Sequence, residues 1–452
     1  MIRLKSSAIA MAFGLIASGS ASAADNADLA EIRKQIESLT QRHLEDEKRI
    51  QELERRLERA EAATSQASAD AKQATAVAAA IPAPVAAAAP ASSANSFNPA
   101  ISGVLDGKFG VFSRDPATYN VAGFPLGGEG PGQRGLFLGE AELNAQANVD
   151  DLFMGSLTLS LSDDDGNTQA NLEEAFIQTT SLPGGFQATV GKFLSDIGYL
   201  NSFHEHADDF ADRPLAYRAF LADGVVDTGA RLTWLAPTDF YLRFGAEAFR
   251  GNSFPAAGSA DHGFGAKSVY IRGGDDIGTE ISYQAGVSWL WADAIGRATG
   301  TLPDVFDGSS QVGIAHFVLK WAPNGNPVSQ NVKFQAEVLR NHIDGRFKGF
   351  GIARTDYGAY AQLIYQFKPQ WRVGYRFDWL TAGDVPTSLI GSTLDSAGNK
   401  PDRHSVMLEY DHSEFSRIRL QYSFDQSRLM GTDHQFLLQY TATIGAHPAH
   451  SY

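Results

Sequence analysis

The chain has 452 residues, no Cys, and a formal net charge of −15 from 37 basic and 52 acidic side chains. Zero Cys excludes a disulfide framework, a thiolate metal site and a thiol nucleophile. The acidic balance argues against a nucleic-acid partner, which needs basic patches. Beyond the first two dozen residues no apolar run approaches 18, so the sequence offers no spanning helix. Hydrophobic residues nevertheless make up 43%, and their interleaving with polar residues is typical of a membrane β-barrel.

The N-terminus predicts an export signal over residues 1–23. Arg3 and Lys5 give it a positive start, and an apolar core over residues 8–17 follows. That core is too short to span a bilayer, and Ala-Ser-Ala at 21–23 is a small-residue cleavage site. We therefore predict cleavage after Ala23 and export to the periplasm, the outer membrane or the medium. The strand pattern of the remaining chain then favours the outer membrane of a Gram-negative cell.

Residues 24–61 are predicted to form a coiled coil, and residues 62–96 an Ala/Pro/Ser-rich linker. The coil's polar seam residues, His43 and Asp46, are of the kind that set register or oligomer number. Spacing of 3 and 4 residues alternates along the seam, which consists of Leu29, Ile32, Ile36, Leu39, His43, Asp46, Ile50, Leu53, Leu57 and Ala60.

Residues 97–452 are predicted to be all-β, a transmembrane antiparallel barrel of about sixteen strands. The apolar residues Trp371, Val373, Tyr375, Phe377 and Trp379 alternate with a face that carries three charges. A soluble sandwich alternates too, but the export signal and aromatic strand ends favour a membrane barrel. An eight-stranded barrel would be filled by side chains, and a plugged 22-stranded one would need more chain. The strands are expected to begin near Ile101, Gly135, Leu152, Leu172, Phe186, Val225, Phe240, Gly265, Thr279, Gln311, Val332, Tyr357, Trp371, His404, Arg417 and Gln435.

The expected connections alternate in length, as periplasmic turns and external loops do in membrane barrels. Short turns are predicted at 149–151, 183–185 and 236–239. Long loops are predicted at 113–134, 195–223, 251–264, 293–310 and 381–401. With both chain ends on the periplasmic side, the strand number must be even.

One segment resembles a known family. Val-Gly-Lys-Phe at 190–193 ends a strand and opens the segment 195–221, which contains Arg-Pro-Leu at 213–215 and Phe220. This is similar to the strand and constriction loop of the phosphate-selective porin O/P family. The resemblance implies a signal peptide, a short periplasmic helical segment, a sixteen-stranded barrel and a trimer.

The charges depart from that family. A phosphate-selective pore should carry a basic ladder at its constriction. Here residues 204–212 read His-Glu-His-Ala-Asp-Asp-Phe-Ala-Asp, and residues 97–452 carry 26 basic and 40 acidic side chains, or −14. Phosphate selectivity is therefore not expected. If this loop folds inward, a cation-preferring or weakly selective lumen is the better electrostatic expectation.

The same loop contains candidate metal ligands. His204 and His206, with Asp208 and Asp209, combine imidazole and carboxylate, which suits Zn²⁺. The alternative is an acidic, solvated pore loop. The predicted pore-lining residues are Arg231, Arg243, Glu247, Lys333, Glu337, Arg372, Arg376, Asp378, Glu409, Arg417, Arg419 and Asp425.

The sequence therefore favours a passive outer-membrane channel for small hydrophilic solutes or ions, assembled as a homotrimer in the lipid of that membrane. No cofactor and no nucleic acid is expected. No Ser/His/acid set supports an enzyme. Two alternatives stay open: an outer-membrane protein that binds or takes up zinc-type metal ions, and an envelope tether whose coiled coil reaches toward the cell wall. Whether the 195–223 loop folds into the lumen is the deciding observation.

Overall fold

The computed structural model describes residues 99–126, 130–139, 141–164, 167–258, 263–299 and 304–445, without the side chains of 163, 164, 167 and 168. The predicted signal peptide, coiled coil and linker lie outside these residues. The envelope-tether alternative, which depends on the coil, therefore stays a prediction. Among the described residues, no helix is long and apolar enough to cross a bilayer.

Within the described residues, seventeen strands make up almost all of the regular structure. They are β1 (Ala100–Phe112), β2 (Gly135–Leu138), β3 (Ala141–Asn148), β4 (Phe153–Asp164), β5 (Asn167–Thr179), β6 (Phe186–Leu194), β7 (Val226–Leu235), β8 (Tyr241–Phe249), β9 (Ala266–Ile277), β10 (Ile281–Ala298), β11 (Val305–Trp321), β12 (Asn331–Phe347), β13 (Phe350–Lys368), β14 (Trp371–Thr381), β15 (Asp402–Ser413), β16 (Ser416–Asp425) and β17 (Asp433–Gly445). The helical elements are α2 (Leu215–Leu221) and the 3₁₀ turns η1 (Pro116–Thr118), η2 (Pro183–Gly185), η3 (Leu200–Ser202), η4 (Glu205–Ala207), η6 (Pro323–Gly325) and η7 (Thr387–Leu389).

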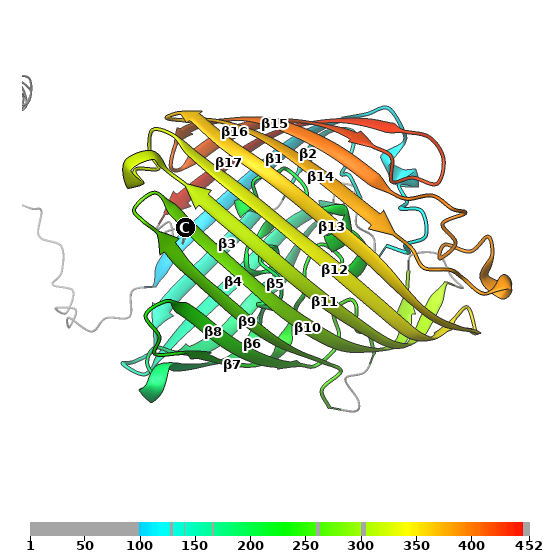
Figure 1. Ribbon diagram of the computed structural model, residues 1–452, viewed down its shortest axis with the longest axis horizontal. Helices are drawn as coiled ribbons and strands as arrows, with labels where there is room; N and C mark the ends of the chain where they lie inside the picture. Colours follow the sequence, from blue (N-terminus) through cyan, green and yellow to red (C-terminus); the bar gives the residue numbers. More distant parts are fainter. Residues whose placement is uncertain are drawn as a thin grey trace, which may run out of the picture. The chain divides into compact units, whose positions relative to one another are not determined.

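The strands close into a barrel (Figure 1). Each strand pairs antiparallel with the next around the wall, and β1 pairs with β17 from Ser102 opposite Gly445 to Phe112 opposite Gln435. Strands β2 and β3 both pair with β1 and occupy one position. The seventeen segments therefore fill sixteen strand positions around the barrel, and the predicted antiparallel sixteen-stranded barrel is confirmed.

The two faces of the wall differ in chemistry because successive side chains of a strand point to opposite sides. On β14, Trp371, Val373 and Tyr375 are 37%, 38% and 45% exposed on the outside. Arg376 and Asp378 of the same strand are buried on the inside. The alternation seen in the sequence therefore separates an apolar outer face from a charged inner one.

One predicted loop is wrong. Residues 293–310 were expected to form a long connection, but β10 continues to Ala298 and β11 begins at Val305. Strand β13 likewise begins at Phe350, seven residues before its predicted start at Tyr357, after a tight turn at Lys348 and Gly349. In these extensions the buried face carries apolar residues, among them Ala294, Phe306 and Ile352. Asp293 and Asp307 lie on the exposed face, so the alternation of apolar outside and polar inside that marks the other strands is lost there.

An apolar cluster lies inside the barrel, where α2 packs against β13 and β14. Gly358 of β13 permits this close approach. A Cβ atom there would lie 2.7 Å from Leu380 Cδ2 and 2.9 Å from Ala216 Cβ of α2. Phe220 of α2 also meets Phe124 edge to face at 5.7 Å between ring centroids. The interior is therefore partly a packed core as well as a polar wall.

Candidate functional site

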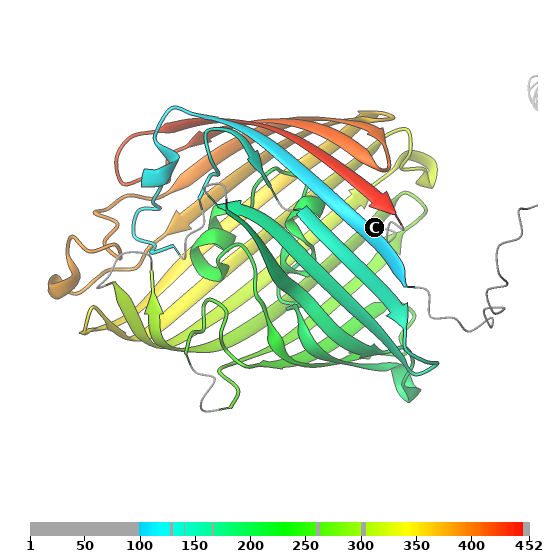
Figure 2. The ribbon, with the colours of Figure 1, turned by 180° about the vertical axis from the view of Figure 1, so that it is seen from behind.

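Residues 195–225, here called the inner loop, connect β6 to β7 and lie within the ring of strands. Figure 2 shows their green helical turns inside the barrel. The loop bonds to side chains of strands that precede and follow it in sequence, including Lys108 of β1, Glu247 of β8, Glu337 of β12 and Arg419 of β16. The loop that the sequence left unplaced therefore folds inward and narrows the lumen.

The start of the inner loop is held by β7 to β9. The Asp196 carboxylate lies 3.1 Å from Arg243 and 3.6 Å from Arg231, and it accepts a hydrogen bond of 2.8 Å from the Tyr270 hydroxyl. Burial alone would raise the pKa of Asp196, but Arg231, Arg272 and Arg243 outweigh it and hold that pKa well below its usual range. This carboxylate is therefore a fixed anion.

Glu337 of β12 anchors the middle of the loop. Its carboxylate accepts hydrogen bonds from the backbone N–H groups of Tyr199 (3.1 Å) and Leu200 (2.9 Å) and from the hydroxyl of Tyr217 (3.0 Å). The Tyr360 hydroxyl donates a further bond of 2.7 Å from the wall. Four donors on one buried carboxylate fix both the first turn of the loop and α2.

The loop aspartates face a basic sector of the wall. Asp209 receives Lys333 Nζ at 2.8 Å and Arg372 Nη2 at 2.5 Å. Burial would raise the pKa of Asp209, but Lys333 and Arg372 lower it well below its usual range. The negative charge that the sequence assigned to the constriction is therefore largely compensated at this residue.

Asp212 is compensated still more strongly. Its carboxylate lies 2.5 Å from Arg403, 2.8 Å from Arg376 and 2.9 Å from Arg218 of α2, and Gln421 donates a bond of 2.7 Å. Burial would raise the pKa of Asp212, but Arg403, Arg376 and Arg218 hold it well below the ordinary range. Asp212 joins the loop to β14, β15 and β16 at once.

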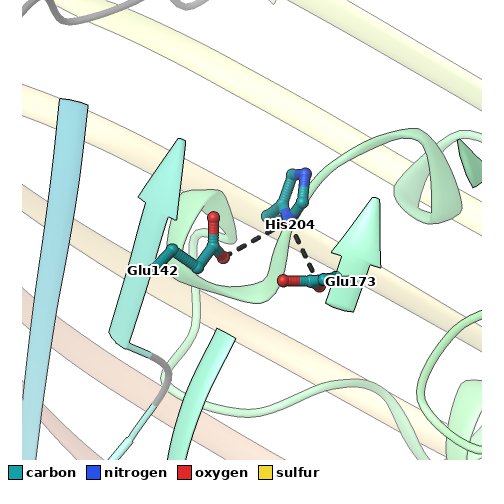
Figure 3. A group of neighbouring side chains, drawn as sticks. All are labelled: Glu142, Glu173 and His204. Carbon is teal, nitrogen blue, oxygen red and sulfur yellow. Dashed lines mark ion pairs between the residues drawn. The ribbon is translucent and has the colours of Figure 1, made fainter. Parts of the chain in front are cut away.

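The loop histidines face an acidic sector formed by β3 and β5, and Figure 3 shows His204 beside Glu142 and Glu173. His204 Nδ1 lies 3.3 Å from both Glu142 Oε1 and Glu173 Oε1, and its Nε2 lies 3.1 Å from Glu174 Oε2. His206 Nδ1 lies 2.8 Å from Glu142 Oε1. Burial lowers the pKa of His204, but the carboxylates of Glu142, Glu173 and Glu174 raise it well above its ordinary value.

A β-bulge brings two of these glutamates together. In the pairing of β4 with β5, Thr158 faces Glu174 and the next residue, Leu159, faces Leu172, so Glu173 is the extra residue. A bulge re-aims a side chain that regular alternation would point outward. Consecutive glutamates thus both reach the loop.

The predicted pore-lining residues all lie on the inner face. Except for Glu409 and Asp425, each bonds directly to the inner loop. Glu409 pairs with Arg372 and Arg419, and Asp425 accepts a bond from Gln435. Their role in permeation remains a prediction.

The predicted metal ligands separate into two groups. His204 and His206 stack with ring centroids 5.7 Å apart. Asp208 instead pairs with Arg213 at 2.9 Å, and Asp209 with the basic sector. The histidines therefore meet wall glutamates rather than the loop aspartates that are near them in sequence.

Sequence reasoning missed several inner residues. Arg403 lies six residues before Glu409 on β15. Because six is a multiple of two, the alternation of the strand was enough to predict that both side chains point to the same inner face. Arg272 of β9, which donates to the Gly198 carbonyl at 2.8 Å, sits two residues from the inward Tyr270. No local signal marks Glu173, because its orientation depends on the bulge.

A polar cavity of about 590 Å³ remains between the loop and the wall, at the end where the β7–β8 and β9–β10 turns lie. Tyr199, Arg243, Arg272 and Lys320 are among its lining residues. Across the lumen, Asn144, Gln146 and Ser156 of β3 and β4 keep partial exposure.

A closed sixteen-stranded barrel with a charged interior has a porin-like fold. The outer membrane channel DcaP of Acinetobacter baumannii aligns with a TM-score of 0.51 and 12% identity, over 78% of this chain and 99% of DcaP. Pseudomonas putida OprB aligns with a TM-score of 0.49 and 10% identity, over 77% of this chain and 94% of OprB.

No protein-family model matches the chain. A protein of Aquifex aeolicus (strain VF5), described as uncharacterized, is 31% identical over 400 residues, covering 80% of this chain and 81% of that protein. The chain belongs to the same family as this Aquifex protein. The resemblance to the phosphate-selective porin O/P family is not tested by these comparisons and stays a prediction.

Proposed function

We propose that the protein is an outer-membrane channel for passive diffusion of small hydrophilic solutes or ions, assembled as a homotrimer. The observation that carries this proposal is a charged loop held across the interior of a porin-like barrel, with a polar cavity of about 590 Å³ beside it. Water-filled lumens narrowed by fixed charges filter solutes by size and charge. Permeation through such a pore uses no cofactor and no chemical step.

We infer weak charge selectivity. The acidic loop alone suggested a preference for cations, but Asp209 and Asp212 are paired with wall lysine and arginines. The glutamates of β3 and β5 occupy a different sector of the wall from the arginines of β14 to β16. Charges of opposite sign in different sectors produce a field across the lumen rather than a barrier to one sign of ion.

Planar-bilayer recording on the purified, folded protein tests this function. We expect discrete, ohmic conductance steps in KCl and a reversal potential near zero in a tenfold salt gradient. Bilayers that receive detergent alone provide the control. If folded protein gives no conductance, the channel assignment is rejected. Chemical cross-linking in detergent, followed by mass measurement, tests the trimer separately.

A further inference from the structure

The loop histidines and the acidic sector form a compact set of ligand atoms. One ligand atom each from Glu142, Glu173 and His204 lies within 4.8 Å of the others. They come from three separate parts of the chain: β3, β5 and the inner loop (Figure 3). We propose that these three residues bind a divalent transition-metal ion of the Zn²⁺ class, with His206 beside them.

The two distances from His204 Nδ1 fit a metal site better than they fit hydrogen bonds. Zinc bonds to imidazole nitrogen and carboxylate oxygen are roughly 2.0–2.2 Å, so two ligand atoms of a tetrahedral site lie about 3.3–3.5 Å apart. His204 Nδ1 lies 3.3 Å from both Glu142 Oε1 and Glu173 Oε1. Charge-assisted N–H···O bonds are shorter, about 2.7–2.9 Å.

Two atoms of the cluster are buried without a hydrogen bond. In the described part of the chain, Glu173 Oε2 has no hydrogen-bond partner, and His204 Nδ1 has only its two 3.3 Å contacts with Glu142 and Glu173. Buried polar atoms are nearly always satisfied, and an unsatisfied one in a native site calls for an ion or another ligand. His204 Nε2 is engaged by Glu174 at 3.1 Å, an arrangement that orients a ligating imidazole and fixes its free nitrogen.

The charge balance points the same way. Over the described ranges, Glu142, Glu173 and Glu174 form ion pairs with histidines alone, and with no Lys or Arg. The loop aspartates, by contrast, each have an arginine or lysine partner. The carboxylates of Glu142, Glu173 and Glu174 thus contact only the imidazoles of His204 and His206. A divalent cation would compensate their excess negative charge.

A metal at this site would join the inner loop to the wall. His204 belongs to the loop, whereas Glu142 and Glu173 belong to β3 and β5. The side chains are partly exposed, at 20% for His204 and 15% for Glu173, although the atoms Nδ1 and Oε2 themselves are buried. Resting on the proposed channel function, we infer that bound metal fixes this edge of the constriction and lowers conductance.

Calorimetry with ZnCl₂ on the full chain in detergent tests the site itself. We expect one ion per chain, with affinity reduced at least tenfold in His204→Ala and in Glu173→Gln. Glu205→Gln is the matched control. It removes one acidic charge beside His204, but Glu205 is not among the converging ligands.

The proposal is overturned if the folded parent binds no zinc, or if Glu205→Gln weakens binding as much as Glu173→Gln, since that would indicate general charge attraction. The first outcome is also the one expected if His204 is protonated and only forms ion pairs with the glutamates. Heat-modifiable migration on gels confirms that each variant is folded.

Single-channel recording with and without zinc tests the consequence. We expect micromolar to submillimolar Zn²⁺ to lower the conductance of the parent and of Glu205→Gln, but not of His204→Ala. Zinc binding without any channel current would overturn the channel function while leaving the metal site intact. Channel current without zinc binding would overturn the metal site while leaving the channel function intact.

Discussion

Replacing Asp212 with Ala tests how the inner loop is held. The Asp212 side chain is 7% exposed and contacts Arg218, Arg376 and Arg403, which are 2% or less exposed. Removing one member of a buried ion pair costs about 3–5 kcal/mol, because it leaves an uncompensated buried charge. That cost corresponds to a rise of about two to three and a half orders of magnitude in the undocked population of the loop. The remaining loop contacts make this an upper limit.

The lack of native Cys makes a clean labelling assay available. Ala219→Cys places a thiol on α2 at a position that is 6% exposed. We expect a charged methanethiosulfonate reagent to label it slowly in the parent, and much faster when Asp212→Ala is added. Conductance should also become larger and noisier. Asp151→Asn, at an exposed turn between β3 and β4, is the control that removes an acid far from the loop. Equal labelling rates in all three backgrounds would refute the reasoning.

Three further predictions concern other parts of the pore. Gly358→Val should displace α2, because even a Cβ would lie 2.9 Å from Ala216 Cβ. Faster labelling of Ala219→Cys measures this, and an unchanged rate would contradict the packing described. Arg272→Gln removes a cation that binds the loop carbonyls of Asp196 and Gly198 and lines the cavity. Its reversal potential should shift toward cation preference, whereas a shift toward anions would be inconsistent with this role. Deleting residues 25–96 should leave conductance intact if the barrel alone forms the pore, and loss of current from a folded barrel would disprove that.

The barrel could be predicted from the sequence because its main signal is local. Alternation on segments such as 371–379 indicates which face of a strand is apolar and points outward and which face is polar and points to the lumen. All sixteen predicted strand positions have a counterpart in the wall. The signal failed where the buried face is apolar and the exposed face carries acidic residues, as at the end of β10 and the start of β11. The alternation signal also missed the break between β2 and β3, because both segments pair with β1 and occupy one strand position of the barrel.

The site was harder to predict because its partners are distant in sequence. The residues of 204–212 suggested an exposed acidic loop, and nothing nearby indicates that Arg376 and Arg403 compensate Asp212. The meeting of His204 with Glu142 and Glu173 depends on strand register and on one bulge. Residue type therefore identified the loop as important, whereas only the fold determines what each side chain binds.

The position of the inner loop also constrains how the chain assembles. The loop bonds to β1 and β3, which precede it, and to β12 through β16, which follow it. Its docking contacts therefore span most of the polypeptide, and contacts of such long sequence separation form late and slowly. The last hydrogen bonds between the inner loop and the wall can form only once the C-terminal strands are in place. Closure of the barrel and placement of the inner loop are therefore coupled events. A half-built barrel would present the loop's apolar helix and unpaired aspartates to solvent, which makes this intermediate the stage most in need of protection during biogenesis.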